Sequence, residues 1–231
     1  MSVIAIIDYG RGNLGSVEKA FERLGLEAAV TQEGSVVDAA DAVVLPGDGA
    51  FHDAMANLDT LGLLPAVRRA LDGRRPFLGI CLGYQRLFSS SEEFGEGRGL
   101  DVVPGVVRRF PPGRKIPHMG WNQVRHDGRL RLFEGIPEDT YFYFVHSYYP
   151  VLDGVGGLGV AWCEYGLRFA AAIERGPIWA TQFHPEKSQR WGLRLLENFA
   201  AMVRAPASER SQAPPGAGHP RTDPVSPAPL Q

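Results

Sequence analysis

Residues 76–88 read PFLGICLGYQRLF, and this stretch decides how the rest of the chain is interpreted. Pro76–Cys81 is a short apolar run typical of a strand buried on both faces, and a helix is predicted over Leu82–Phe88. The junction GICLG, residues 79–83, has the pattern of a nucleophile elbow in which cysteine stands in the place of serine. Such a turn lifts one side chain out of a sheet, and its flanking glycines make room for tight backbone packing.

The reactivity expected of the cysteine in this junction depends on its position directly before a predicted helix. The positive end of the helix dipole stabilises the Cys81 thiolate, and the backbone N–H of Leu82 is predicted to point where an oxyanion would form. An ordinary buried cysteine at the end of a core strand is the competing interpretation of this pattern alone. Cys163 lacks such a context and is expected to be a small buried hydrophobic residue.

A thiol nucleophile usually works with a histidine base and a residue that orients the base. His184 follows the predicted strand Ile178–Gln182 in the sequence QFHPE, with Glu186 two residues further on. Because open α/β sheets place their sites at the carboxyl ends of strands, His184 is expected near Cys81, with Glu186 fixing its tautomer. A surface turn without chemistry is the alternative for this stretch. His126 is expected in a polar turn.

Around the elbow, apolar strands and helices alternate in the first half of the chain. Strands are also predicted over Val3–Asp8, Glu27–Thr31 and Ala42–Leu45, and helices over residues 17–24 and 64–71. This order favours an α/β fold with a mostly parallel central sheet flanked by helices. The second half is expected to add antiparallel strands at Asp101–Phe110, Trp121–Arg125, Thr140–Tyr149, Val160–Cys163, Phe169–Glu174 and Ile178–Gln182. A last helix is predicted over Gln189–Met202, with Ser188 as its N-cap.

Composition limits the classes of function. The 231 residues carry a net charge of −2, which argues against a nucleic-acid binder with a basic face. No apolar run approaches the roughly 20 residues of a membrane span, and the chain is expected to be cytoplasmic. Two cysteines exclude a disulfide framework and make a structural zinc site improbable. Residues 204–231 hold 7 of the 18 prolines and are predicted to be a disordered tail, leaving one domain over residues 1–203.

Together, the elbow and the QFHPE stretch resemble the class I glutamine amidotransferases, a family with a Cys-His-Glu triad and a flavodoxin-like fold. Cys81 in GICLGYQ precedes His184 and Glu186 in TQFHPEKS by about 100 residues, in the family's order. Four further stretches narrow the resemblance to the glutaminase subunits of imidazole glycerol phosphate synthases: DYGRGNL (8–14), PGDGAF (46–51), PHMGWN (117–122) and FVHSY (144–148). PHMGWN is the most specific, and the resemblance spans residues 3–200.

The resemblance implies a role for each matching residue. The Cys81 thiolate is implied to attack the side-chain amide of L-glutamine, while His184 transfers protons and Glu186 orients His184. The backbone N–H groups of Leu82 and Asp48 are implied to hold the oxyanion, with a flip of the Gly47–Asp48 peptide as a switch. The amino-acid end of the substrate is implied to contact Gly49, Gln85, Glu93, Ser147 and Tyr148.

The resemblance also implies a partner. Ammonia would pass to a (β/α)8-barrel cyclase subunit, which makes imidazole glycerol phosphate and an aminoimidazole carboxamide ribotide in histidine biosynthesis. The two chains would form a heterodimer in which the glutaminase is nearly silent until the cyclase and its substrate bind. Residues implied to lie at or near the interface are Trp121, Asn122, Tyr143 and Lys187. No metal or organic cofactor is implied.

Two residues depart from the family pattern, and other functions compete. Asp48 stands where an aliphatic residue is usual, and Tyr84 stands where methionine is commoner and is expected to reshape the pocket. The nearest alternative is the amidotransferase subunit of another pathway, such as anthranilate or aminodeoxychorismate synthase. A stand-alone γ-glutamyl or cysteine hydrolase would share the nucleophile and the histidine without a partner. A regulatory subunit without chemistry is disfavoured by the intact Cys81, His184 and Glu186.

Overall fold

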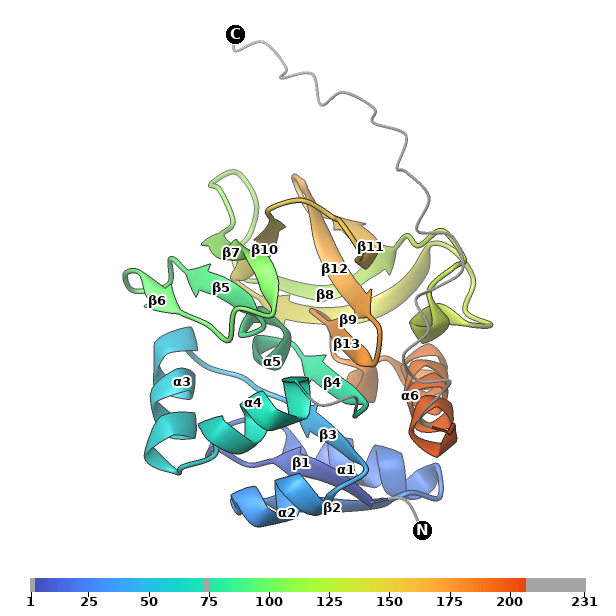
Figure 1. Ribbon diagram of the computed structural model, residues 1–231. Helices are drawn as coiled ribbons and strands as arrows, with labels where there is room; N and C mark the ends of the chain where they lie inside the picture. Colours follow the sequence, from blue (N-terminus) through green and yellow to red (C-terminus); the bar gives the residue numbers. More distant parts are fainter. Residues whose placement is uncertain (1–2, 73–74, 207–231) are drawn as a thin grey trace, which may run out of the picture.

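A seven-stranded sheet forms the centre of the computed structural model, which describes residues 3–72 and 75–206 (Figure 1). The strand order is β11-β12-β13-β4-β3-β1-β2, in which the strands from β13 to β2 are parallel and β11 and β12 are antiparallel. Their bounds are β1 (Val3–Ile7), β2 (Glu27–Thr31), β3 (Ala42–Leu45), β4 (Phe77–Ile80), β11 (Gly159–Glu164), β12 (Arg168–Arg175) and β13 (Ile178–Thr181). The predicted α/β class with added antiparallel strands is confirmed.

Both faces of this sheet are covered, which explains why its strands are continuous apolar runs. Along β1, Ile4 and Ile6 face one core while Ala5 and Ile7 face the other, as the two-residue period of a strand requires. The first core is completed by α1 (Leu14–Arg23), α6 (Gln189–Arg204) and the hairpin of β8 (His118–Val124) and β9 (Thr140–His146). The second core is completed by α2 (Gly34–Ala39), α3 (Phe51–Thr60), α4 (Leu64–Asp72) and a four-stranded sheet of β10 (Tyr148–Leu152), β7 (Val103–Arg109), β5 (Phe88–Ser91) and β6 (Gly97–Arg98).

Two predicted elements differ most from those in the structure, whereas others, such as α1 and β8, differ by a few residues at their ends. The helix after the elbow, α5, covers only Leu82–Gln85, because Phe88 already pairs with Val103 on β7. The predicted strand Thr140–Tyr149 is divided at Ser147 into β9, which pairs with β8, and β10, which pairs with β7. In both cases, pairing with strands distant in the sequence overrides the local pattern.

Ser188 stands at the N-cap position of α6, as predicted, but its side chain makes no capping hydrogen bond. Its hydroxyl donates to the His184 carbonyl oxygen at 2.7 Å and accepts the Tyr143 N–H at 3.0 Å. The hydroxyl instead ties the short 3₁₀ helix η2 (Pro185–Lys187) to β9. This contact holds the turn that carries His184.

Helix α6 extends to Arg204, one residue past the predicted domain boundary, and the Arg204 guanidinium donates to the Leu24 carbonyl oxygen at 2.8 Å. Residues 207–231 of the predicted tail lie outside the described residues. Within residues 3–72 and 75–206, none of the helices has the length and apolar character needed to cross a membrane.

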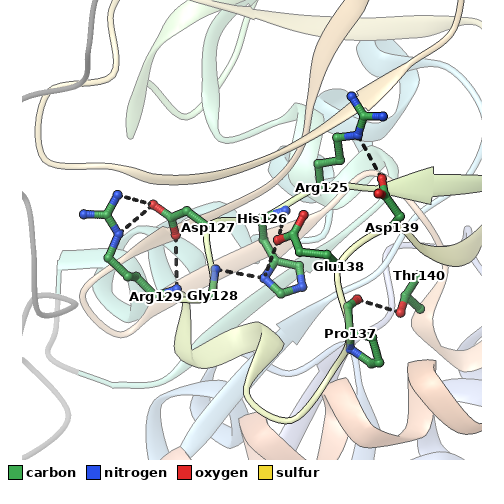
Figure 2. Close-up of polar contacts among 9 residues, drawn as sticks. All are labelled: Arg125, His126, Asp127, Gly128, Arg129, Pro137, Glu138, Asp139 and Thr140. Atoms are coloured by element: carbon green, nitrogen blue, oxygen red, sulfur yellow. Dashed lines mark hydrogen bonds and ion pairs between the residues drawn. The ribbon is translucent and has the colours of Figure 1, made fainter.

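Polar contacts hold the connection between β8 and β9, which also contains the 3₁₀ helix η1 (Arg131–Phe133) (Figure 2). Arg125 and Asp139 form an ion pair at 2.8 Å, and the Glu138 carboxylate accepts the backbone N–H of His126 at 2.9 Å. The His126 ring stacks on Phe133, with ring centroids 4.7 Å apart, and is buried. His126 thus occupies the predicted turn, but its side chain belongs to the core.

Candidate active site

Three neighbouring parallel strands end at the same edge of the sheet. Strand β4 lies between β3 and β13, and Cys81 directly follows β4. The loop of residues 46–50 follows β3, and His184 comes shortly after β13. Because the carboxyl ends of adjacent parallel strands meet, segments far apart in the sequence converge at one place.

The elbow has the strained geometry that the sequence predicts. Cys81 has φ +54° and ψ −107°, a backbone conformation that residues other than glycine rarely adopt. Its backbone N–H donates to the Thr181 carbonyl oxygen of β13 at 2.7 Å. A Cβ on Gly83 would overlap the carbonyl oxygen of Leu45, so α5 approaches β3 closely only with glycine at that position. The hydrogen bond to β13 and the close packing against β3 together fix the position of the cysteine.

His184 and Glu186 form a buried pair beside this cysteine. The His184 Nδ1 lies 2.8 Å from the Glu186 carboxylate, and the two side chains are 7% and 1% exposed. Burial lowers the pKa of His184, but the interactions with the Cys81 sulfur and with Glu186 outweigh it and raise the pKa to about 10. The site therefore favours a protonated imidazole next to the Cys81 sulfur.

Gln182 is a neighbour of the sulfur to which the sequence analysis gave no role. Its amide nitrogen lies 3.8 Å from the Cys81 Sγ, and its amide oxygen accepts from the Gln85 amide at 3.0 Å. The Gln85 amide also donates to the Tyr148 carbonyl oxygen at 2.9 Å. Since that carbonyl can only accept, the orientation of both amides follows, and Gln182 donates an N–H to the sulfur. The sequence signal that could have pointed to Gln182 is its amide side chain, which stands at the end of the strand directly before FHPE.

The predicted oxyanion site is not assembled in this structure. The Leu82 N–H, expected to point at an oxyanion, donates to the Gly47 carbonyl oxygen at 3.4 Å. This carbonyl competes for the donor because the peptide between Gly47 and Asp48 is turned towards the elbow. Asp48 itself is exposed and lines the cavity. In this conformation the Gly47 carbonyl oxygen, and not the Asp48 N–H, faces the Leu82 N–H.

A cavity of about 430 Å³ collects most of the predicted site residues. Its lining includes Asp48, Gly49, Cys81, Leu82, Gln85, Glu93, Ser147, Tyr148, His184 and Lys187. Asn13, Pro117, Val145 and His146 also line it, and the sequence analysis gave them no role. The Glu93 carboxylate accepts the backbone N–H of Phe51 at 2.7 Å, and burial raises its pKa. Glu93 thus anchors the start of α3, next to Gly49.

Tyr84 does not shape this cavity, contrary to the prediction. Its ring is fully buried in the second core, packs edge-on against Phe88 with centroids 5.3 Å apart, and its hydroxyl donates to the Ala170 carbonyl oxygen at 3.2 Å. The side chain points away from Cys81 because α5 presents opposite faces to the site and to the core. Cys163 is buried as predicted, and burial raises the pKa of its thiol to about 12.

The predicted interface residues lie on the hairpin and on η2. Trp121 is 45% exposed and meets Tyr143 edge-on across the two strands, with ring centroids 6.0 Å apart. Asn122 points to the other face of β8, where its amide donates to the Glu164 carbonyl oxygen at 2.9 Å. Lys187 is exposed at the mouth of the cavity.

Comparison with known proteins decides the family. The family model for class-I glutamine amidotransferases matches residues 5–203. The chain belongs to the class-I glutamine amidotransferases. Within this family it is similar to the imidazole glycerol phosphate synthase subunit HisH of Moorella thermoacetica, with 54% identity over 204 residues that cover 88% of this chain and 97% of that protein. The HisH subunit of Methanothermobacter thermautotrophicus is 52% identical over 205 residues, covering 88% and 100%.

Solved structures of other proteins share the fold at low sequence identity. A glutamine amidotransferase from Thermotoga maritima superposes with a TM-score of 0.65 at 16% identity, covering 88% of this chain and 99% of that chain. PurLQS from Thermotoga maritima gives a TM-score of 0.65 at 15% identity, with the same coverage. The amidotransferase fold thus carries the elbow, the histidine and the cavity described above.

Proposed function

We propose that the chain is the glutaminase subunit of an imidazole glycerol phosphate synthase and hydrolyses L-glutamine to glutamate and ammonia. One observation supports this reaction: Cys81 and His184 line the same cavity, and the Glu186 carboxylate is hydrogen-bonded to the His184 imidazole. The assignment to this synthase is supported by about 50% identity to HisH subunits over nearly their whole length.

The first half-reaction forms a thioester. The Cys81 thiolate, next to the amide of Gln182, attacks the side-chain carbonyl carbon of glutamine and forms a carbon–sulfur bond. The carbonyl oxygen becomes an oxyanion, which the N–H groups of Leu82 and Asp48 hold after the Gly47–Asp48 peptide has turned. His184 then gives its proton to the departing nitrogen, so that ammonia leaves and the glutamyl thioester remains.

The second half-reaction regenerates the thiolate. Neutral His184 takes a proton from water, the hydroxide attacks the thioester carbonyl, and the carbon–sulfur bond breaks to give glutamate. Glu186 stabilises the imidazolium each time it forms and keeps Nε2 directed at the reacting groups. Gln85, Glu93, Gly49 and the Ser147–Tyr148 backbone hold the amino-acid end of the substrate in the same cavity.

We assign the ammonia to a cyclase partner in a heterodimer. Exposed apolar side chains on the hairpin, namely Met119, Trp121 and Tyr141, support a partner-binding face there, which also carries Tyr143. Asn122 lies on the other face of β8 and lines a cavity together with Trp121. Lys187 is exposed and lines the cavity that contains Cys81. Within the described residues Cys81 and Cys163 are both free, which supports a reducing, cytoplasmic location for the complex.

Ammonia release from glutamine tests the proposal. The full chain is assayed alone, and then with a cyclase subunit of imidazole glycerol phosphate synthase and the ribulose-phosphate substrate of that subunit. We expect little release alone, a large rise in the complex, and loss of that release in C81A. Release that survives in C81A would overturn the nucleophile. Strong release that the cyclase does not change would move the chain to another amidotransferase or to a stand-alone γ-glutamyl hydrolase.

A further inference from the structure

A chain of short hydrogen bonds runs from the partner-side hairpin to the glutamine pocket. The Asn122 amide nitrogen lies 3.2 Å from His118 Nε2, and His118 Nδ1 lies 2.9 Å from His146 Nε2. His146 Nδ1 in turn lies 2.7 Å from the Tyr148 carbonyl oxygen. The same carbonyl accepts the Gln85 amide at 2.9 Å, so the chain ends on the segment that is proposed to bind the substrate.

The direction of every bond in this chain follows from backbone groups at its two ends. The Asn122 side-chain oxygen accepts the Gln123 N–H at 2.8 Å, and its nitrogen donates to the Glu164 carbonyl oxygen at 2.9 Å. The amide nitrogen therefore also donates to His118 Nε2, which must be an unprotonated acceptor. His118 then carries its proton on Nδ1 and donates to His146, which carries its own proton on Nδ1 and donates to Tyr148.

Both imidazoles are therefore neutral, and their surroundings keep them so. A proton on either Nε2 would place two donors against each other. Burial lowers the pKa of His118 to about 4, and burial together with the nearby His118 and His184 lowers the pKa of His146 to about 3, against the Tyr148 carbonyl, which raises it. The His118 ring is stacked between Phe144 and Tyr165, with centroids 4.8 Å and 4.0 Å away. The rings are thus fixed by packing as well as by hydrogen bonds.

The two histidines also separate two cavities. His146 lines the cavity that contains Cys81, whereas His118 lines a second cavity of about 610 Å³. Asn122 and the exposed Trp121 line the second cavity too. A group that enters the second cavity therefore meets Asn122 and His118, and only His146 lies between His118 and the Tyr148 carbonyl.

We propose that His118 and His146 are positioning residues that couple the hairpin face to the glutamine pocket. A partner side chain that competes for the Asn122 amide shifts His118, and the shift passes through His146 to the carbonyl that also holds Gln85. Identifying this partner with the cyclase rests on the proposed function. The coupling itself is a property of this chain.

Kinetics of the complex provide the first test. His118→Phe keeps an aromatic ring between Phe144 and Tyr165 but removes both ring nitrogens. We expect KM for glutamine to rise about tenfold while kcat changes much less, because the two buried hydrogen bonds of His118, to Asn122 and to His146, are lost behind the pocket. The matched control Tyr165→Phe removes only the hydroxyl, which donates to the Lys115 carbonyl oxygen outside the chain of bonds, and should change KM less than twofold.

A double variant tests whether the residues act as one unit. Asn122→Ala should raise KM in the same direction as His118→Phe, and the combined variant should be no worse than His118→Phe alone, since both remove links of one chain. Effects of the two substitutions that multiply would overturn the proposal, as would an unchanged KM in His118→Phe.

Imidazole ¹⁵N resonances of the isolated full chain provide a readout that needs no partner. We expect His118 and His146 to be neutral Nδ1–H tautomers at pH 7, and Asn122→Ala to shift the resonances of both. His126, a buried histidine in the turn of Figure 2, serves as the unshifted control. An unmoved His146, or an Nε2–H tautomer, would overturn the proposal. If the wild-type complex fails to hydrolyse glutamine, the proposed function fails, and this spectrum alone still decides the coupling.

Discussion

Gln182 directs an amide N–H at the nucleophilic sulfur, and its removal should slow the chemistry of that sulfur. In Gln182→Leu the donor 3.8 Å from Cys81 is lost while a side chain of similar size fills the buried position. A hydrogen bond to a thiolate of about 1 kcal/mol corresponds to about a fivefold loss. Alkylation of Cys81 by iodoacetamide at pH 7 should slow by that factor. An unchanged rate would remove Gln182 from the site.

Together with the Cys81 sulfur, Glu186 raises the pKa of His184 and keeps the imidazole protonated. In Glu186→Gln the charge is lost, so the pKa of His184 should fall from about 10 towards its ordinary value, and kcat should fall at least about a hundredfold. An NMR titration of His184 with a parallel glutaminase assay checks both. Glu138→Gln, which changes the carboxylate 3.3 Å from His126, is the control and should leave both unchanged.

At this scale the sequence predicts the residues of a local motif but not contacts between distant segments. Cys81, His184 and Glu186 stand in short patterns whose spacing has a chemical meaning, so they can be named in advance. The contact of Gln182 with Cys81 joins positions 101 residues apart, and the His118–His146 pair joins positions 28 residues apart. Such pairs depend on sheet order and register, which no single stretch encodes.

The elbow is the element whose backbone leaves least room for change. In Gly83→Ala the new Cβ would overlap the Leu45 carbonyl oxygen, which is backbone and cannot rotate away. We expect the free energy of unfolding to fall by about 3 kcal/mol or more. Gly15→Ala in α1, where a Cβ meets nothing within 4 Å, is the control and should be neutral or stabilising by up to about 1 kcal/mol. Urea unfolding measures both, and equal losses would refute the steric argument.

Elements were predictable where the local pattern and the tertiary pairing agree. Strands β2 and β3 were predicted at their observed bounds, because both are short β-like runs that end at turn or polar residues. The helix after Cys81 was predicted too long, because Leu82–Phe88 is apolar on a helical period although Phe88 belongs to β5. The division of residues 140–149 at Ser147 could not be predicted from the sequence, because the side-chain pattern of the two halves is the pattern that a single continuous strand would have. It matters for function, since the break brings the Tyr148 carbonyl within reach of both His146 and Gln85.

The whole molecule brings its chemistry to one sheet edge and its exposed aromatic residues to the adjoining hairpin. Strands β13, β4 and β3 are adjacent and parallel, which places the QFHPE, elbow and PGDG segments side by side. The β8–β9 hairpin adjoins this edge of the sheet and exposes the side chain of Trp121. Asp48, where a peptide flip is proposed, lines the same cavity as Cys81 and Lys187.

The free energy of unfolding should fall in acid because His118 and His146 stay neutral in the fold. Their folded pKa values of about 4 and about 3 lie below the ordinary value of 6.5, so below pH 6.5 the unfolded chain binds protons that the folded chain does not. Stability is therefore complete above pH 6.5 and is lost as the pH falls towards 4, by about 1.4 kcal/mol per pH unit for each imidazole.

His184 acts in the opposite direction, because its folded pKa of about 10 lies above 6.5. Its stabilisation is complete below pH 6.5 and is lost as the pH rises through 10, since the folded chain holds a proton that the unfolded chain has released. Urea unfolding of the full chain between pH 4 and 10 should show both limbs. His118→Phe should reduce the slope of the acid limb by the contribution of one imidazole and leave the alkaline limb unchanged. A wild-type stability that does not change between pH 6.5 and 4 would mean that these imidazoles become protonated in the fold, which the direction of their hydrogen bonds forbids.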